Sequence, residues 1–258
     1  MNKKLRTFVY PVCAFIVLLL LWQVCVMLST SEIAFPTPVA VFKEFFYILT
    51  HKVGNYYTVV GHVLWSLSRV LVGFSIAAVF GIILGLTMGW FDYVRAVMMP
   101  IFNLLRPIAP LAWIPLAILW FGIEEKYKYF LIFIAAFVPF TLNAFAGASH
   151  VDKQLVGAAR MLGASKSQLF FEIVVPAAVL SIFSGAQVAL SNSWMTMLAA
   201  EMVCATEGVG RIIIAGQSVN DMTQMIAGML AIGIVGLLLA IGRRKLEERC
   251  LIWNNQGK

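Results

Sequence analysis

The chain has 258 residues; 61% of them are apolar, 12% are charged, and the formal net charge is +7. A soluble domain has about 45–50% apolar and about 25% charged residues, so this composition excludes a water-soluble globular fold and a disordered chain. We interpret the positive charge as basic residues in loops at a membrane surface, and we expect no nucleic acid as a partner.

Long stretches without charged residues predict an all-α, polytopic membrane protein. Backbone groups in hydrocarbon must form their hydrogen bonds within the segment, which favours helices, and the alternating pattern of a barrel does not occur. The basic start and the apolar run behind it resemble a signal peptide, but the run is too long for one and predicts a span. The sequence predicts a single domain over residues 1–258 with about six spans, at about 7–31, 62–91, 96–121, 129–149, 173–200 and 222–242.

The distribution of Lys and Arg predicts how these spans are oriented. The loops that share a side with both termini hold 12 basic residues, and the other side holds six, Arg69 and Lys128 among them. Basic residues are enriched in cytoplasmic loops. We therefore expect both termini in the cytoplasm.

Residues 36–57, after the first span, have apolar side chains at Val39, Phe42 and Phe46. This helical spacing predicts a helix that lies on the outer membrane interface. Residues 201–221, after the fifth span, carry three glycines among apolar residues and could dip partly into the membrane while lining a cavity.

Three glycines, Gly81, Gly85 and Gly89, recur at four-residue intervals on the second predicted span. Small residues at this spacing permit close packing of helices. The contact could lie within one subunit or across a dimer.

The third predicted span is interrupted by Arg106 and by three prolines. Pro107, Pro110 and Pro115 remove backbone hydrogen bonds and free carbonyls, which suits a helix that lines a cavity. An arginine at the centre of a span costs about 2.5–3.5 kcal/mol on insertion scales. Arg106 could therefore contact an anion from the cavity, or it could lie near the end of the span and reach the membrane interface.

The loop between the fourth and fifth spans, residues 150–172, predicts two short helices at an angle. Asp152 is a plausible N-cap, and the apolar residues after it have helical spacing. Gly163 stands where a C-cap glycine would, and a second short helix from Lys166 leads towards Pro176. Small residues around the bend would let a partner's backbone approach closely. From spacing alone, an amphipathic loop resting on the lipid surface fits equally well.

The fifth predicted span carries polar residues that could line a translocation pathway. Asn192 and Thr196 share one helix face, and Ser191 and Trp194 share another. These side chains could contact an oxyanion, or they could only form hydrogen bonds between helices. Together with Arg106, the pathway candidates are Ser191, Asn192, Trp194, Met195, Thr196 and Glu201.

Glu201, at the outer end of the fifth predicted span, would repel an anionic substrate. We expect it to pair with Arg211 or Arg69 instead.

Five ordered blocks of this sequence resemble the nitrate/sulfonate/taurine subgroup of binding-protein-dependent ABC importer permeases, most closely the taurine and sulfonate permeases. The 150–172 loop is similar to the family signature of Glu-Ala-Ala, three residues, Gly, nine residues and Ile-x-Leu-Pro, with Gly157 in place of Glu and Val175 in place of Leu. The signature positions that match in register are Ala158, Ala159, Gly163, Ile173 and Pro176, and the blocks are FPTPVAVF, SLSRVLVGF, LRPIAPLAWIPLAILWFGI, AARMLGAS and AAEMV.

This resemblance implies a function and a set of partners. The 150–172 loop would be a coupling helix that docks on a cytoplasmic ATPase. Two ATPase subunits, a second permease copy forming a homodimer, and an extracytoplasmic solute-binding protein are implied, in the inner membrane of a prokaryotic cell. The substrate would be a small anion, taurine or another sulfonate, with nitrate, bicarbonate or a pyrimidine precursor as alternatives. The residues implied in ATPase coupling are Gly157, Ala158, Ala159, Arg160, Leu162, Gly163, Ala164 and Ser165.

The sequence contains no GxxxxGK[ST] phosphate loop, no nucleophile–base set and no metal-ligand spacing. We therefore expect a chain that is not an enzyme and holds no cofactor or metal, while ATP and Mg²⁺ bind the separate ATPase. A stand-alone secondary transporter is the alternative from another class. No span carries an Asp or Glu near its middle, as a proton relay usually needs.

Overall fold

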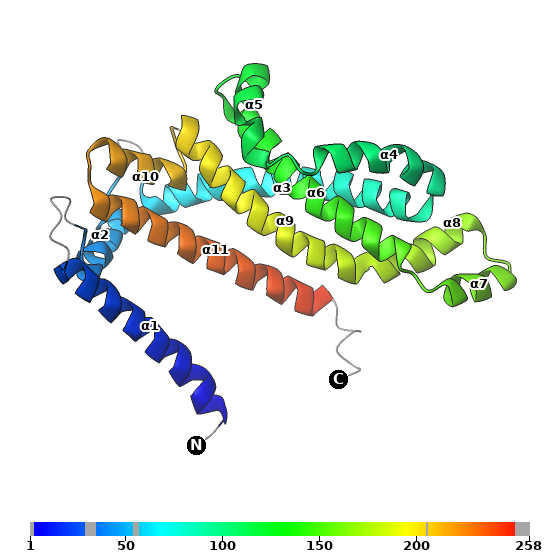
Figure 1. Cartoon of the computed structure of the whole chain (residues 1–258), viewed down its shortest axis with the longest axis horizontal. Coiled ribbons are helices and arrows are strands. Elements are labelled where there is room, and N and C mark those ends of the chain that lie inside the picture. The colour runs from blue at the N-terminus through cyan, green and yellow to red at the C-terminus, as the bar shows by residue number, and fades with distance from the viewer. Residues whose placement is uncertain (1–2, 29–34, 54–56, 205, 251–258) are drawn as a thin grey trace.

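The computed structural model describes residues 3–28, 35–53, 57–204 and 206–250. Within these ranges the elements are helices and no strand occurs, so the predicted all-α class is confirmed. Most of the long helices run roughly along the longest axis of the molecule, and short helices gather at both of its ends (Figure 1).

The core consists of three long helices, α3 (Val59–Trp90), α6 (Glu125–Ser149) and α9 (Val175–Cys204), with α6 packed against both of the others. Glycines on α3 bring α6 close. A Cβ added at Gly81 would lie 2.8 Å from the Cβ of Phe140, and one at Gly89 would lie 2.5 Å from the Cβ of Ala148. The three glycines therefore pack within the subunit.

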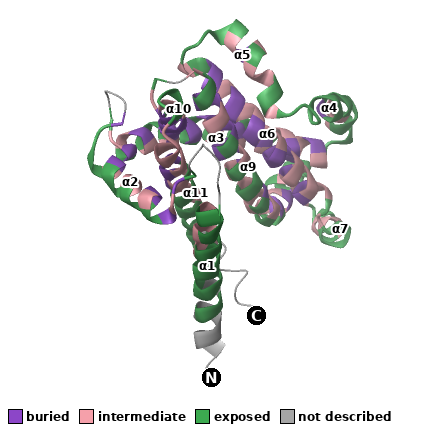
Figure 2. Cartoon of the chain, turned by 60° about the vertical axis from the view of Figure 1, so that its left-hand side comes forward, coloured by how far each residue is buried: buried purple, intermediate pink, exposed green. Residues whose placement is uncertain are grey.

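Four helical segments are long and apolar enough to cross a membrane: Val59–Trp90, Glu125–Ser149, Lys166–Cys204 and Met222–Glu247. They correspond to the second, fourth, fifth and sixth predicted spans. The first predicted span falls on α1 (Lys3–Leu28), which contains a shorter apolar helix, Val12–Leu28, with mostly exposed side chains (Figure 2). Residues 29–31 of that span lie outside the described residues.

The third predicted span, residues 96–121, is not one continuous helix. Its residues fall in α4 (Asp92–Leu105), a 3₁₀ turn (Pro110–Trp113) and α5 (Ile114–Phe121), and the two arms meet at 82°. Pro107 and Pro110 lie at the break, where proline cannot donate the backbone hydrogen bond that a continuous helix needs. Arg106 is therefore the C-cap of α4 and lies, exposed, at the break between the two arms.

The two short helices expected in the 150–172 loop are present as α7 (Lys153–Met161) and α8 (Lys166–Gln168). The Asp152 carboxylate accepts the N–H of Gln154 at 2.8 Å, so the predicted N-cap is confirmed. Gly163 has φ +91°, the left-handed conformation that ends α7 as predicted. Sequence reasoning missed that α8 continues into a π-helix, Leu169–Val174, before α9 begins.

The opposite end of the molecule holds α2 (Pro38–Thr50), α10 (Val209–Ser218) and the start of α11 (Met222–Cys250) (Figure 1). The predicted helix over residues 36–57 is shorter than expected because it ends at Thr50. Its residues Val41 and Ile48 are buried in a cluster with Ile212, whereas Val39 and Phe46 are exposed. The residues 201–221 form the end of α9, a turn and α10.

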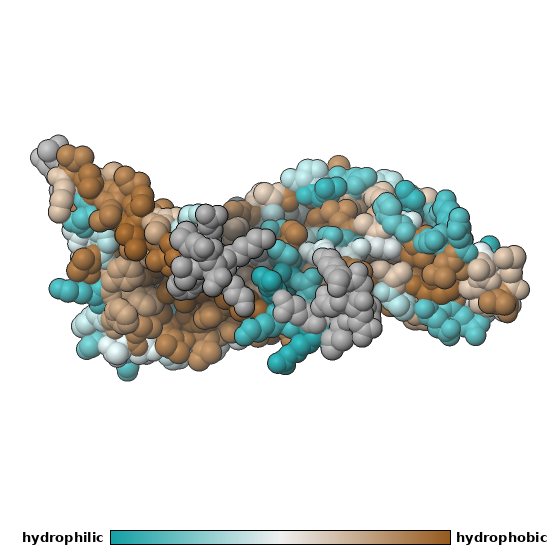
Figure 3. Space-filling model, turned by 90° about the horizontal axis from the view of Figure 1, so that it is seen from below, coloured by the Kyte–Doolittle hydropathy of each residue, from teal (hydrophilic) through white to brown (hydrophobic). Residues whose placement is uncertain are grey.

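The surface is divided along the long axis. Seen from below, apolar side chains dominate the end where α1 and α2 lie, and hydrophilic side chains are more frequent towards the end with α7 and α8 (Figure 3).

Candidate functional site

The first candidate site is the 150–172 loop, which projects from one end of the molecule (Figure 1). Its tip is apolar: Met161 is 86% exposed and Leu162 is 89% exposed. Exposed apolar side chains beside a fixed bend are typical of a surface that a partner covers. Sequence reasoning missed Met161, although it lies in the AARMLGAS block.

The loop is anchored firmly to the core. Leu169 and Val174 are buried, and the ring of Phe170 lies 6.4 Å from Trp90 and 5.9 Å from Phe91, at the end of α3. At the start of α8, Ser165 and Gln168 form a capping box in which each side chain bonds the other's backbone N–H. The loop is therefore packed on the end of α3 and continuous with α9.

The predicted coupling residues divide between the surface and the inside of the loop. Gly157, Ala159 and Ala164 are half-buried, and a cavity of about 320 Å³ that Gly157 and Arg160 line separates α7 from the end of α3. Those that are exposed are Ala158, Arg160, Leu162, Gly163 and Ser165.

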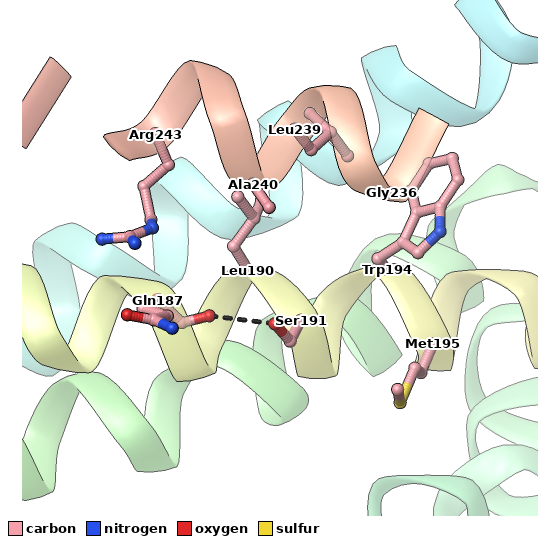
Figure 4. A pocket seen from close by; sticks show the side chains of 9 residues that line it. All are labelled: Gln187, Leu190, Ser191, Trp194, Met195, Gly236, Leu239, Ala240 and Arg243. Atoms are coloured by element: carbon pink, nitrogen blue, oxygen red, sulfur yellow. Dashed lines mark hydrogen bonds between the residues drawn. The ribbon is translucent and has the colours of Figure 1, made fainter. Parts of the chain in front are cut away.

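The second candidate site is a cavity of about 230 Å³ between α9 and α11 (Figure 4). Ser191, Trp194 and Met195 line it from α9, so the structure brings three of the predicted pathway residues together. Arg243 lines it from α11 and donates to Glu247 at 2.5 Å. The Ser191 hydroxyl donates to the backbone carbonyl of Gln187 at 3.2 Å, as a helix-internal hydrogen bond.

The third candidate site is a cavity of about 310 Å³ at the break between α4 and α5, lined also by α6 and α9. It unites two predicted pathway residues, Arg106 and Asn192, that lie far apart in the sequence. Trp113 also lines it and was missed. The sequence could have pointed to it, because Trp113 lies between Pro110 and Pro115 and brings an N–H donor to the segment where the span is broken.

Thr196 does not share the environment of Asn192. It is only 5% exposed, and it does not line either of these two cavities. The expected Asn192–Thr196 face is thus split, because α9 has neighbours on several sides and one turn is enough to move from a cavity to a packed contact.

Glu201 belongs to a buried ion cluster at the other end of the core. Its carboxylate accepts the Arg69 guanidinium at 2.8 Å and the Ser66 hydroxyl at 2.7 Å. Arg69 also binds Glu125 through two nitrogens, at 2.5 and 2.8 Å, and the Lys128 ammonium donates to Glu125 at 2.7 Å. Of the two partners expected for Glu201, Arg69 is the one found.

This cluster ties the turn after α9 to α3. The N–H of Val209 donates to the Ser66 hydroxyl, the N–H of Gly210 to Glu201 and the N–H of Gly208 to His62 Nδ1, at 2.9–3.1 Å. Arg69 completes the set by donating to the backbone carbonyl of Glu207 at 2.9 Å.

The charge count placed Arg69 and Lys128 on the side of the membrane away from the termini, as loop residues. This placement in loops was wrong, because both are buried side chains, of α3 and α6. The signal that could have revealed the cluster was the i,i+3 placement of Ser66 and Arg69 on an apolar helix, where a charge needs a partner.

Comparison with known proteins identifies the family of this chain. Residues 77–244 match the family described as binding-protein-dependent transport system inner membrane component. The taurine transport system permease protein TauC of Escherichia coli (strain K12) is 33% identical over 235 residues, which cover 91% of this chain and 86% of the relative.

Two further relatives are named for other anions. The nitrate import permease protein NrtB of Synechocystis is 38% identical over 248 residues, covering 92% of this chain and 90% of the relative. The bicarbonate transport system permease protein CmpB of Synechococcus elongatus is 33% identical over 245 residues, covering 92% and 87%. The chain therefore belongs to the family of binding-protein-dependent inner membrane components, as a permease subunit of an ABC importer.

Proposed function

We propose that this permease pairs with a second, identical copy, docks two cytoplasmic ATPase subunits that bind ATP and Mg²⁺, and imports a small oxyanion delivered by an extracytoplasmic binding protein. The family description and the names of the relatives support the machine and the class of substrate. Within that class we propose taurine or another sulfonate first, from the likeness of residues 105–123 and 199–210 to taurine and sulfonate permeases. Nitrate, bicarbonate and pyrimidine precursors are the alternatives.

The observation that carries the proposal is the exposed apolar tip of the 150–172 loop. Met161 and Leu162 are almost fully exposed on a bend that Gly163 and the capping box of Ser165 fix. A monomer gains nothing from exposing two large apolar side chains on a fixed turn, whereas a groove on an ATPase would bury them.

The structure suggests how ATP binding would move the pathway. The loop is joined to α9 through the π-helix and is packed on the end of α3, so these elements would follow it as a rigid body. Closing of the ATPase dimer would draw two such loops together and open the opposite end of the permease dimer. The partner would hydrolyse ATP, and this chain would supply the coupling loop and the translocation pathway.

The proposed orientation places α7 and α8 in the cytoplasm with both termini of the chain. In the structure, α2 and α10 lie at the end opposite to α7 and α8 (Figure 1), so these two helices would face the binding protein. The chain would be a multi-pass protein of a prokaryotic inner membrane.

The test is to replace Leu162 by Asp and to measure co-purification with the ATPase and uptake of taurine, nitrate and bicarbonate. We expect the variant to insert normally, to lose the ATPase and to lose uptake. Leu246→Asp is the matched control, since Leu246 is also apolar and exposed but lies on α11. Wild-type uptake by Leu162→Asp contradicts the docking, and uptake by the purified chain alone, driven by an ion gradient, would identify a secondary transporter instead.

A further inference from the structure

The break between α4 and α5 creates a cavity with the character of a small-molecule site. Its volume is about 310 Å³, and rings of Phe130, Phe133 and Phe137 form much of its wall. Ligand sites in proteins have volumes of about 300–1,000 Å³ and are mostly apolar, with a few polar groups that fix the ligand's orientation. The cavity therefore has room for a small organic molecule.

Three side chains with hydrogen-bond donors line this cavity: Arg106, Trp113 and Asn192. The indole Nε1 of Trp113 is buried and has no acceptor in the part of the chain that the structure describes. Within the same residues, Arg106 has no carboxylate partner, and no Asp or Glu lines the cavity. Of the three, only the indole nitrogen is a buried donor, whereas Asn192 is half-buried and Arg106 is exposed. A buried donor without an acceptor is costly, so this arrangement favours a ligand that brings acceptor oxygens.

The other two cavities along the core differ in charge. The cavity of about 670 Å³ beside the ion cluster is lined by equal numbers of carboxylates and cations: Glu124, Glu125, Glu201, Lys126, Lys128 and Arg211. In the α9–α11 cavity, the cation Arg243 is already paired with Glu247. Of these three cavities, the one at the α4–α5 break combines a lining free of carboxylates with a cation that has no carboxylate partner among the described residues.

We infer that Arg106, Trp113 and Asn192 form a binding site for an organic sulfonate on the translocation pathway. The inference rests on the proposed function and names the substrate's contacts within it. The planar guanidinium can donate two parallel hydrogen bonds to two oxygens of a sulfonate, and the indole and amide N–H groups can reach the remaining oxygens. The phenylalanine rings would cover the carbon chain, which nitrate and bicarbonate lack.

The test uses the permease–ATPase complex in nanodiscs of phosphatidylcholine, without binding protein, and measures the Kd of a radiolabelled alkyl sulfonate, with the unlabelled sulfonate, taurine and nitrate as competitors. We expect Arg106→Gln to raise the Kd about tenfold or more, because a charge-assisted pair is lost. Trp113→Phe keeps an aromatic ring and removes only the N–H, and it should raise the Kd about fivefold. This conservative variant keeps the test valid if Arg106→Gln does not assemble with the ATPase.

Two matched controls remove a charge or an indole that lies outside the cavity lining. Arg95→Gln lies on α4, and Trp22→Phe lies on α1 and removes another buried indole N–H that has no acceptor among the described residues. Both should leave the Kd within about twofold of wild type. Equal Kd values for all variants, or no sulfonate binding by a complex that nevertheless imports sulfonate with its binding protein, would overturn the inference alone. A complex that imports nothing with ATP would instead overturn the proposed function.

Two further outcomes decide the ligand's identity. Nitrate that competes better than the alkyl sulfonate would contradict the role of the aromatic wall. An anionic lipid headgroup presents similar oxygens, so the measurement is repeated with phosphatidylglycerol in the nanodiscs. If sulfonate fails to bind in phosphatidylcholine and phosphatidylglycerol associates in an Arg106-dependent manner, the site is a lipid site and the inference is wrong.

Discussion

Gly208 lies directly against the carboxylate of Glu201, so that a Cβ at residue 208 would overlap the carboxylate atoms. The backbone of Gly208 also has φ +116°, a conformation that other residues rarely adopt. Both facts have one cause: the turn after α9 wraps closely around Glu201 so that its N–H groups can reach the ion cluster. The glycine is therefore a structural part of that cluster.

We expect Gly208→Ala to destabilise the folded protein by about 1–3 kcal/mol, because it adds backbone strain and displaces the carboxylate. The measurement is the thermal unfolding midpoint of the purified permease in detergent. Gly233→Ala is the control, since a Cβ there meets no atom within 4 Å and the residue lies inside α11. It should be neutral or slightly stabilising, and equal losses for the two variants would contradict the packing described.

Ser66 holds the cluster and the turn together with a single hydroxyl. Ser66→Ala removes the donor to Glu201 and the acceptor for Val209 N–H. Leaving buried polar groups without partners costs about 1–3 kcal/mol. Ser68→Ala, on an exposed position of the same helix, removes only a local bond to Trp65 and should stay within about 0.5 kcal/mol. The two unfolding curves should separate clearly; if they coincide, Ser66 does not have this role.

Arg69 neutralises two carboxylates at once. Arg69→Met should cost about 3–5 kcal/mol, because breaking one side of a buried ion pair leaves a charge without compensation. Adding Glu201→Met should recover much of that loss, since Glu201 is the fully buried partner, whereas 41% of the Glu125 side chain is exposed. A double-mutant cycle measures this coupling, and additive losses would show that the pair is not coupled.

Close packing of α3 on α6 predicts sensitivity at Gly85. A Cβ there would lie 2.6 Å from the Cβ of Ala144 and would also meet backbone atoms of α6, which cannot move aside cheaply. We expect Gly85→Ala to cost about 1–3 kcal/mol through overpacking. Gly242→Ala, where the Cβ has open space, is the reference. A Gly85→Ala protein as stable as this reference would mean that the two helices lie further apart.

Glu44, on α2 and outside the membrane-spanning segments, should make the stability of the folded protein depend on pH. Partial burial, and then the charge of Asp221, raise the pKa of the Glu44 carboxyl above its usual value. The folded state therefore binds the proton of Glu44 more tightly than the unfolded state does. Above the raised pKa the ionised carboxylate destabilises the folded state, and this destabilisation is lost, so that stability is gained, as the pH falls through that pKa. Unfolding midpoints at pH 7 and at mildly acid pH should show this gain, and Glu44→Gln should reduce it. Glu172→Gln, exposed on the π-helix, should not.

The helices could be predicted from sequence because hydrocarbon demands long charge-free segments, and the bend at Gly163 because its determinants are local. The break in the third span was visible as a proline cluster, but its angle of 82° depends on how α5 packs, which no local pattern contains. Of the ion cluster, the sequence predicted Arg69 as one of two possible partners of Glu201, but not the part played by Glu125 and Lys128. Arg69, Glu125 and Glu201 come from three separate helices, and no local pattern shows that these helices bring them together.

The pathway residues show the same limit at finer scale. Ser191 and Asn192 are adjacent in the chain, and helical spacing correctly separates their faces. Other helices decide what each face contacts. Ser191 faces a cavity lined by α11 and its Arg243, whereas Asn192 faces the cavity at the α4–α5 break. That Trp113 lines the same cavity as Asn192 follows only from the placement of that broken segment against α9.

The π-helix at Leu169–Val174 lies between the 150–172 loop and α9. The number of residues between the loop and a given position on α9 therefore decides which side chain faces each cavity. Each residue of an α-helix turns the chain by about 100° and advances it by about 1.5 Å. A π-turn holds about one residue more than an α-turn, so a deletion within Leu169–Val174 can be absorbed by conversion of this stretch to α-helix. The α-helix that follows has no such spare residue. If the loop and the π-helix keep their places, deleting one residue between Val175 and Gln187 would move Asn192 into the position of Ser191, facing α11.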